Sequence, residues 1–342
     1  MRRIRSARNA YFAGMTNRRI LIFLAVCLLA LPARGADTLS VVFWNLENFF
    51  DWRNDSTSVS DAEFSSLGKR HWTRKRFGAK CQATAKSLLW IAGETGRLPD
   101  IIGLAEIENA FVLRRLLQDT PFRKLDYRYV HFDSPDSRGI DVALLYRTSR
   151  LELVEEAPCP LSDSLPVPTR DILLCRFRMH SGADTDPEFA VLVNHHPSKY
   201  GGAALSAPRR SVAVRRLRSL VDSLSGAGCG RILAVGDFNT TPDDSVLNAL
   251  SPSLVPLHEG LFRRGEGTIK YDGRWELIDH AYVSEAVRRS ALSLRMRILR
   301  IPFLLTRDTV HSGEKPLRTY LGPRYTGGVS DHLPILVEWV FP

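Results

Sequence analysis

Asp237 and Asn239 are the two side chains whose types and spacing most directly suggest chemistry in this sequence. They lie two residues apart after an apolar run that ends at Gly236, and side chains at that spacing point the same way from an extended backbone. The carboxylate could take a proton from water while the amide holds that water in place. Asp and Asn are also common where a strand ends in a turn, which is the alternative interpretation.

Carboxylates at the ends of two other apolar runs could hold a divalent cation. Glu106 and Glu108 follow the run Ile101–Ala105, and Asn45 and Glu47 follow another such run. Mg²⁺ and Mn²⁺ prefer oxygen ligands and keep several of their waters. We predict that Glu106 is a metal ligand and that Glu108 supports it or caps a helix. The alternative is that both glutamates lie in the first turn of a helix, where acidic residues are favoured.

Histidines follow two further runs. His332 comes after Asp331, and a charged imidazole there could offset negative charge on phosphorus, with Asp279 fixing its other nitrogen. His195 and His196 are adjacent. Neighbouring strand residues face opposite ways, so at most one of them reaches the site, and periodicity does not choose between them.

The elements that must position these residues are mainly strands. Two stretches with helical spacing, Lys75–Ile91 and Arg209–Leu224, predict helices. Because strands outnumber helices and do not alternate with them one for one, we predict an α/β fold of two packed sheets with helices outside. The polar stretch Asp51–Thr73 predicts a long surface loop near the site. Apolar runs predict eight strands, namely Leu39–Trp44, Asp100–Ala105, Asp141–Tyr146, Ile172–Phe177, Phe189–Val193, Ile232–Val235, Leu277–Val283 and Pro334–Val340.

Residues 1–35 have the pattern of a secretory signal. Arg18 and Arg19 precede an apolar run, Ile20–Leu31, that is shorter than the roughly 20 residues of a membrane-spanning helix. We therefore predict cleavage after Gly35, a secreted or periplasmic protein, and no stable membrane insertion. Residues 36–342 contain no linker or repeat, which favours a single catalytic domain.

The composition of residues 36–342 says little about partners. Removing the seven Arg of residues 1–35 from the total of 47 Lys and Arg leaves 40 against 37 Asp and Glu, a net charge of +3. Overall charge is therefore poor evidence for a nucleic-acid partner. Cys159 and Cys175 could form a disulfide in an exported protein, and the alternative is unpaired, buried cysteines. A serine hydrolase or an NTPase has no support, because neither a Gly-x-Ser-x-Gly elbow nor a P-loop occurs.

Taken in order, these segments resemble the endonuclease/exonuclease/phosphatase superfamily, which includes deoxyribonuclease I, neutral sphingomyelinases and inositol polyphosphate 5-phosphatases. The similarity runs from Leu39 to Pro342, and NLENFFD, EIEN, NHHPSKYGG and GDFNTTP look closest to exported bacterial endonuclease-like members. The resemblance implies a four-layer α/β sandwich with two packed mixed β-sheets flanked by helices. It also implies hydrolysis of a phosphoester assisted by Mg²⁺, with Mn²⁺ or Ca²⁺ as alternatives.

The resemblance assigns roles to matching positions. The implied metal ligands are Asn45, Glu106 and Asp331. The implied catalytic residues are Asp237 and Asn239, which activate and orient water, His332 with its orienting Asp279, and His195 of the NH motif. The implied substrate contacts are Arg138, Asp141, Lys199, Lys270 and Tyr271. His280, next to Asp279, departs from many members, and its role stays open.

We therefore expect an exported, monomeric nuclease that cleaves DNA or RNA. An alternative is a phosphatase or a phospholipid or sphingomyelin phosphodiesterase on the same fold. The lipid enzyme would be marked by an exposed apolar hairpin, for which Ile301–Leu305 is a candidate. A non-catalytic binding protein should have lost Glu106, Asp237, Asn239 or His332, and all four are present.

Overall fold

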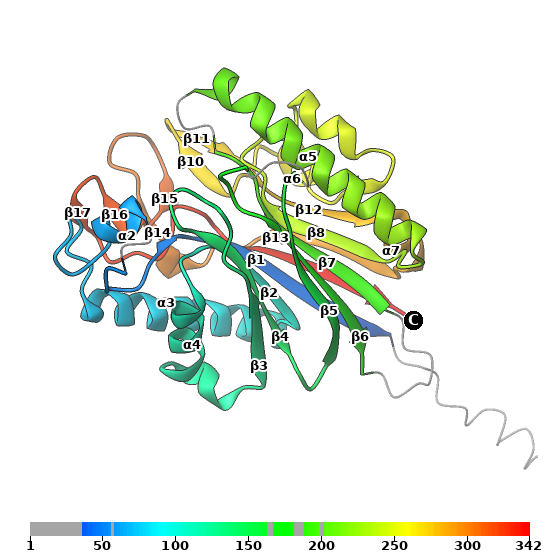
Figure 1. The fold of residues 1–342 in the computed structure, drawn as a ribbon, viewed down its shortest axis with the longest axis horizontal. Helices are drawn as coiled ribbons and strands as arrows, with labels where there is room; N and C mark the ends of the chain where they lie inside the picture. Colours follow the sequence, from blue (N-terminus) through cyan, green and yellow to red (C-terminus); the bar gives the residue numbers. More distant parts are fainter. Residues whose placement is uncertain (1–35, 56–57, 163–166, 181–187, 199–201) are drawn as a thin grey trace, which may run out of the picture. The chain divides into compact units, whose positions relative to one another are not determined.

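Two six-stranded sheets form the centre of the computed structural model, which describes residues 36–55, 58–162, 167–180, 188–198 and 202–342 (Figure 1). In spatial order the first sheet contains β13 (Ser293–Ile298), β18 (Ile335–Phe341), β1 (Asp37–Phe49), β2 (Ile101–Ile107), β4 (Asp141–Arg147) and β3 (Tyr127–His131). The second contains β5 (Leu151–Cys159), β6 (Ile172–Met179), β7 (Glu188–His195), β8 (Ile232–Asp237), β12 (Asp279–Ser284) and β9 (Leu254–Pro256).

Each sheet has one parallel pair near its middle. β1 pairs with β2, and β7 pairs with β8. Next to these pairs, β4 lies antiparallel to β2, and β12 lies antiparallel to β8. The carboxyl ends of a parallel pair lie at one edge of a sheet, so side chains that follow these strands come together. The predicted two mixed sheets are confirmed.

Short elements connect and cover the sheets. The helices are α2 (Val59–Glu63), α3 (Arg74–Thr95), α4 (Ala110–Gln118), α5 (Ala203–Gly226), α6 (Glu259–Arg263), α7 (Glu285–Ser290) and the 3₁₀ turns η1 (Pro121–Lys124), η2 (Ser245–Leu250) and η3 (Pro302–Leu304). Three hairpins join β10 (Ile269–Tyr271) to β11 (Arg274–Glu276), β14 (Leu305–Arg307) to β15 (Glu314–Pro316), and β16 (Tyr320–Leu321) to β17 (Arg324–Tyr325).

The two faces of each sheet are both buried, as the continuous apolar runs predict. In β1, Val41 and Phe43 join the core between the sheets, whereas Val42 and Trp44 join the core beneath α3 and α4. This alternation is the period of two that an extended strand requires. Figure 1 shows α5 on the opposite side of the sheets from α3 and α4, which completes the four layers.

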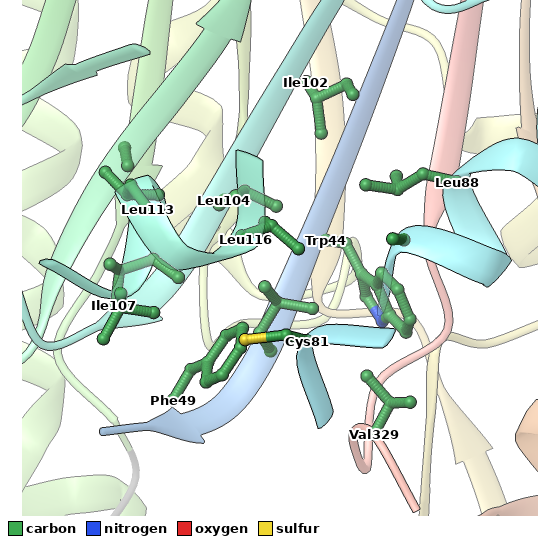
Figure 2. Packing of buried hydrophobic residues seen from close by; sticks show 14 of the residues in the cluster. Trp44, Phe49, Cys81, Leu88, Ile102, Leu104, Ile107, Leu113, Leu116 and Val329 are labelled. Carbon is green, nitrogen blue, oxygen red and sulfur yellow. The ribbon is translucent and has the colours of Figure 1, made fainter. Parts of the chain in front are cut away.

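The helices are fixed by their caps and by their apolar faces. The Thr73 side chain accepts a hydrogen bond from the Arg76 N–H at the start of α3, and Gly96 ends the helix at φ +73°. Figure 2 shows Cys81 and Leu88 of α3 beside Trp44 of β1. The helices predicted from Lys75 and from Arg209 are confirmed, with earlier starts than the periodicity indicates.

One prediction needs correction. The stretch Asp51–Thr73 is not simply a surface loop, because it contains α2 and buries Asp61, Phe64 and Trp72. No disulfide joins Cys159 to Cys175, which agrees with the alternative of buried thiols. Among the described residues, none of the helices combines the length and apolar character needed to cross a bilayer. The proposed signal, residues 1–35, lies outside the described residues.

Gly236 is expected to be intolerant of any side chain, because a Cβ there would lie 2.3 Å from the backbone oxygen of Asn194 on β7. Gly236→Ala should lower the free energy of unfolding by about 1–3 kcal/mol, the usual cost of overpacking. Gly93→Ala is the matched control, because its Cβ would meet nothing within 4 Å on α3 and should slightly stabilise the helix. Chemical denaturation measures both; equal effects would contradict the close approach.

Candidate active site

Strand register brings three predicted catalytic residues together. His195 on β7 lies opposite Asp237 on β8, and Asp279 on β12 lies opposite Asp237 from the other side. Adjacent positions on neighbouring strands point to the same face. All three side chains are buried. The motifs NHH, GDFN and LIDH therefore meet although they are separated in sequence.

Asp237 is the residue on which the most contacts converge. Its Oδ2 accepts a hydrogen bond from Asn45 Nδ2 at 3.0 Å and lies 3.6 Å from His195 Nε2 and 3.8 Å from His332 Nε2. Its Oδ1 accepts from the Asn239 N–H at 2.9 Å. Burial raises the pKa of Asp237 to about 7, against the attraction of His332. A carboxylate with a pKa near neutrality suits a general base.

His332 is held by hydrogen bonds on its ring and its backbone. Its Nδ1 lies 2.7 Å from Asp279 Oδ2, and its carbonyl accepts from Trp44 Nε1 at 2.9 Å. Burial opposes the charged form of His332, but Asp279 outweighs it, and the pKa of His332 lies well above its usual value. The ring therefore keeps Nε2 directed toward Asp237 as a proton-bearing group.

Glu106 is the penultimate residue of β2 and faces the same imidazole as Asp237. Its Oε1 lies 4.0 Å from His195 Nε2, its Oε2 accepts from the Asn48 N–H at 2.6 Å, and Arg138 lies at 3.4 Å. Burial pushes the pKa of Glu106 upward, but Arg138 and the Asn48 N–H outweigh it, and the pKa falls below its usual value. The carboxylate is thus kept charged.

Backbone strain collects around this cluster. Glu47, Asn48, Glu106 and Asn239 have φ between +44° and +62°, a region that L-residues avoid at a cost of about 1–3 kcal/mol each. Such strain persists where the surrounding structure imposes it, and it often marks functional sites.

The donor set fits a hard divalent cation. Carboxylate oxygens of Glu106 and Asp237 lie around His195, and the Asn45 side chain reaches Asp237 through its Nδ2. One Asp279 oxygen is buried with no hydrogen-bond partner in the described structure. Asp331 lies at the rim, 3.9 Å from His332 Nε2 and ion-paired to Arg318 at 3.0 Å. Carboxylate and amide oxygens are the ligands that Mg²⁺, Mn²⁺ and Ca²⁺ prefer.

The structure also separates the two adjacent histidines. His195 turns toward Asp237, whereas His196 packs against Phe238 with ring centroids 4.5 Å apart. Asn194 donates to the Leu192 and Val235 carbonyls and stays inside the sheet. Strand β7 extends through His195, and this places His195 at the site.

Three predicted substrate contacts make no hydrogen bond or ion pair with the cluster in the described structure. Asp141 accepts hydrogen bonds from Ser134 and lies 3.3 Å from His131 Nε2. Lys270 is ion-paired with Asp308 at 3.1 Å, and Tyr271 is 70% exposed at a hairpin tip. These geometries give Asp141 and Lys270 structural partners. Arg138 does reach the site, and Lys199 lies outside the described residues.

Buried or partly buried cations that the sequence analysis missed support the site. Lys80 donates to the Glu47 carbonyl at 2.6 Å and to Thr319, and Arg170 donates to Asp136 and to the His196 carbonyl. Arg318 pairs with Glu47 at 2.9 Å as well as with Asp331. Lys80 could have been noticed as a cation on the buried face of α3, one residue from Cys81. Nothing in the sequence marks Arg170 or Arg318.

Behind the catalytic strand ends, three histidines and Phe238 form one cluster of packed rings. His196 and His280 contact the Phe238 ring at 4.5 and 5.1 Å, and His258 lies 4.2 Å from His280. Burial lowers the pKa of His196 to about 3 and that of His258 to about 4, so these rings are neutral packing groups. The open role of His280 is thus structural.

A four-layer sandwich whose strand ends gather acidic, amide and imidazole side chains defines a class of phosphoric ester hydrolases. The chain belongs to the Endonuclease/Exonuclease/phosphatase family, whose model matches residues 40–340. The resemblance expected from the motifs is therefore confirmed. Members of this superfamily use divalent metals. No curated protein matches the sequence.

Solved structures of similar fold have diverse activities. A Bacteroides thetaiotaomicron mannosyl-6-phosphatase is 20% identical with a TM-score of 0.56, over 89% of this chain and 100% of that one. The human Nocturnin catalytic domain with bound sulfate is 18% identical with a TM-score of 0.53, over 90% and 98%. A D. rerio TDP2 complexed with single-strand DNA product is 16% identical with a TM-score of 0.51, over 88% and 98%. At these identities the likeness shows the shared fold.

Asp279→Asn should reduce kcat by about 10²-fold or more, the usual contribution of a positioned proton donor. Because Asp279 raises the pKa of His332, its loss should lower that pKa. The alkaline limb of the pH–rate profile should then move to lower pH, which hydrolysis of bis(p-nitrophenyl) phosphate can measure. Asp222→Asn, which alters an exposed carboxylate bonded to Arg218 and Ser253, is the control. An unmoved alkaline limb would separate Asp279 from His332.

Acid should destabilise the fold through the stacked histidines. Their folded-state pKa values lie below the usual histidine value of about 6.5, so the stability they contribute is full above that pH and declines as pH falls toward 4. The slope should reach up to about 1.4 kcal/mol per pH unit for each histidine. His196→Phe should reduce this slope, because phenylalanine has no titrating group. The change breaks no hydrogen bond, since neither ring nitrogen of His196 has a partner in the described structure.

Denaturant unfolding from pH 7.5 to 4.5 measures this slope. The matched control is His180→Gln, because His180 is exposed, and it should leave the slope unchanged. A steep slope that persists in His196→Phe would mean that other groups cause the acid sensitivity.

Proposed function

We propose that this protein is a metal-dependent phosphodiesterase that hydrolyses nucleic acid, DNA or RNA, by in-line attack of water. The proposal rests on one observation: Asp237 is contacted by Asn45, His195 and His332 within 3.8 Å, although these residues come from four distant parts of the chain. Family membership supports the reaction class.

Each residue has a step that its geometry allows. Asp237 takes the proton of the attacking water. Asn239 donates its Nδ2 to the His196 carbonyl at 3.0 Å, which leaves its amide oxygen able to accept from that water. His332, charged and held by Asp279, donates from Nε2 to a phosphoryl oxygen or to the leaving oxygen, and His195 supports the same charge as a neutral donor.

Asn45, Glu106 and Asp331 would hold the metal ion, with Asp237 beside them. When bound, a divalent cation polarises the phosphoryl oxygen and offsets its developing charge. Arg138 keeps Glu106 ionised, which maintains the ligand. Arg318 holds Asp331 at the rim through its 3.0 Å ion pair.

Nucleic acid is favoured over lipid as the substrate. One neighbour of the same fold was solved with a single-strand DNA product. The candidate lipid-binding hairpin Ile301–Leu305 is not exposed, because Ile301 and Leu304 are buried. Export, which the sequence pattern of residues 1–35 supports, and a monomeric state remain part of the proposal.

A phosphatase that acts on a small phosphomonoester is the second candidate. A pocket of about 130 Å³ adjoins the site and is lined by Glu47, Asn48, Arg318 and Tyr320 among others. This volume suits a single ring. A larger hollow of about 540 Å³, lined by Gly228, Cys229 and neighbours, contains none of the predicted site residues.

Asp237→Asn should lower hydrolysis by at least about 10²-fold because it removes the base. Its melting temperature should stay close to that of the wild type, because Asn keeps the size of the side chain and needs no charge inside the protein. Activity on a single-stranded oligonucleotide, RNA, bis(p-nitrophenyl) phosphate and a hexose 6-phosphate is measured with Mg²⁺ and with EDTA. EDTA should abolish all turnover.

The substrates separate the candidates. Cleavage of the polynucleotides supports the nuclease, whereas turnover of the hexose phosphate alone supports the phosphatase. Undiminished turnover by Asp237→Asn would remove Asp237 from the mechanism.

A further inference from the structure

A long stretch beside the site carries only positive charge. Residues 64–93 contain seven Lys and Arg and no Asp or Glu. The net charge of residues 36–342 is only +3, from 40 basic and 37 acidic residues. The positive charge of this stretch is therefore a local concentration and not a reflection of the overall composition.

This stretch adjoins the catalytic cluster through the small pocket. Arg70 lines that pocket together with Arg318 and Asn48. Arg318 is ion-paired to Asp331, and the Asn48 N–H donates to Glu106. Arg70 is itself anchored to Glu63 at 2.7 Å and to the Gly322 carbonyl. Arg70, the second cation of the stretch, thus shares one cavity wall with residues of the site.

From Arg70 the positive charge continues onto the start of α3. Arg76 donates to the Arg70 carbonyl at 2.8 Å and lies 4.4 Å over the Tyr325 ring, and Arg74 lies 5.7 Å over Trp52. Figure 1 shows α2, β16 and β17 grouped on one side, by one end of α3. The rings hold the guanidinium groups in place, as cation–π contacts do.

Arg74, Lys75 and Arg76 occupy the first turn of α3, which is the positive end of the helix dipole. Cations there are unfavourable by about 0.3–1 kcal/mol each. Within the described residues, none of the three forms a salt bridge with an acidic side chain, and neither does Lys69. An ordinary solvated helix end would carry acidic residues or mixed charges, whereas these cations have no anionic partner among the residues that the structure describes.

We propose that Lys69, Arg70, Arg74, Lys75 and Arg76, the basic strip, bind the sugar-phosphate backbone of a nucleic-acid strand on one side of the scissile phosphate. The inference rests on the proposed function for its ligand. Cations in a row that begins at the pocket match the repeating phosphates of a strand. The rings beneath Arg74 and Arg76, Trp52 and Tyr325, are only partly exposed and are covered by these guanidinium groups, so the strip contacts the backbone and not the bases.

The test reverses two exposed charges of the strip. Arg74→Glu/Lys75→Glu is compared with Arg123→Glu/Lys124→Glu, an adjacent exposed pair on η1. The turn η1 lies just before β3, whose first residue pairs with Arg147. Both pairs are placed in an Asp237→Asn background so that the probe stays intact. The probe is a fluorescent 20-nucleotide single strand, as DNA and as RNA, and anisotropy gives Kd from 50 to 300 mM salt.

The strip variant should bind at least about 10-fold more weakly at low salt. Its slope of log affinity against log salt should shrink by about 1.4, because each phosphate contact on a single strand contributes about 0.7. Its melting temperature should not fall, because acidic residues in the first turn suit the helix dipole. Weaker binding with undiminished stability is a combination that a purely structural role would not produce.

Other outcomes overturn one proposal at a time. If the wild type cleaves the strand and both double variants bind alike, the strip is contradicted and the nuclease is not. If the wild type binds the strand but never cleaves it, the nuclease is contradicted and the strip is not. Loss of binding to phosphatidylglycerol vesicles with oligonucleotide affinity kept would assign the strip to a membrane surface and overturn the inference.

Discussion

The active site depends on how β8 is held between β7 and β12. The two registers put His195 and Asp279 level with Asp237, one on each side. A shift of one residue would turn a catalytic side chain to the opposite face of the sheet. Gly236 allows the close approach of β7 that this register requires, since a Cβ would collide with Asn194. The first sheet then adds Asn45 and Glu106 from its own parallel pair.

Burial makes this arrangement both reactive and costly. Asp237, Asp279 and Glu106 are nearly inaccessible to water, and isolated charges there would be strongly unfavourable. His332 and Arg138 compensate them at short range. Around them, Lys80 and Arg318 hold Glu47 in place, which fixes the carboxyl end of β1. The same confinement that raises the pKa of Asp237 to about 7 fits it to accept a proton.

Much of this site could be predicted because local sequence controls local direction. An apolar run followed by Asp237 and Asn239 fixes where a strand ends and which way those side chains point. Local pattern could not choose between His195 and His196, since the choice depends on where β7 stops. It could not reveal Arg170 or Arg318, because their partners Asp136 and Glu47 lie 34 and 271 residues away along the chain.

The sequence by itself determined most strands of the two sheets, the main helices, the family and the set of candidate site residues, because these follow from short-range periodicity and from motifs that are each contiguous. Only the tertiary structure decided which charges meet. Glu106 faces Arg138, whereas Asp141 and Lys270 pair with other residues. Although residues 36–342 have a small net charge, the fold places a cluster of carboxylates beside a row of cations. Interactions between charges depend on distance in space and on burial, and the spacing of residues along the sequence gives neither quantity.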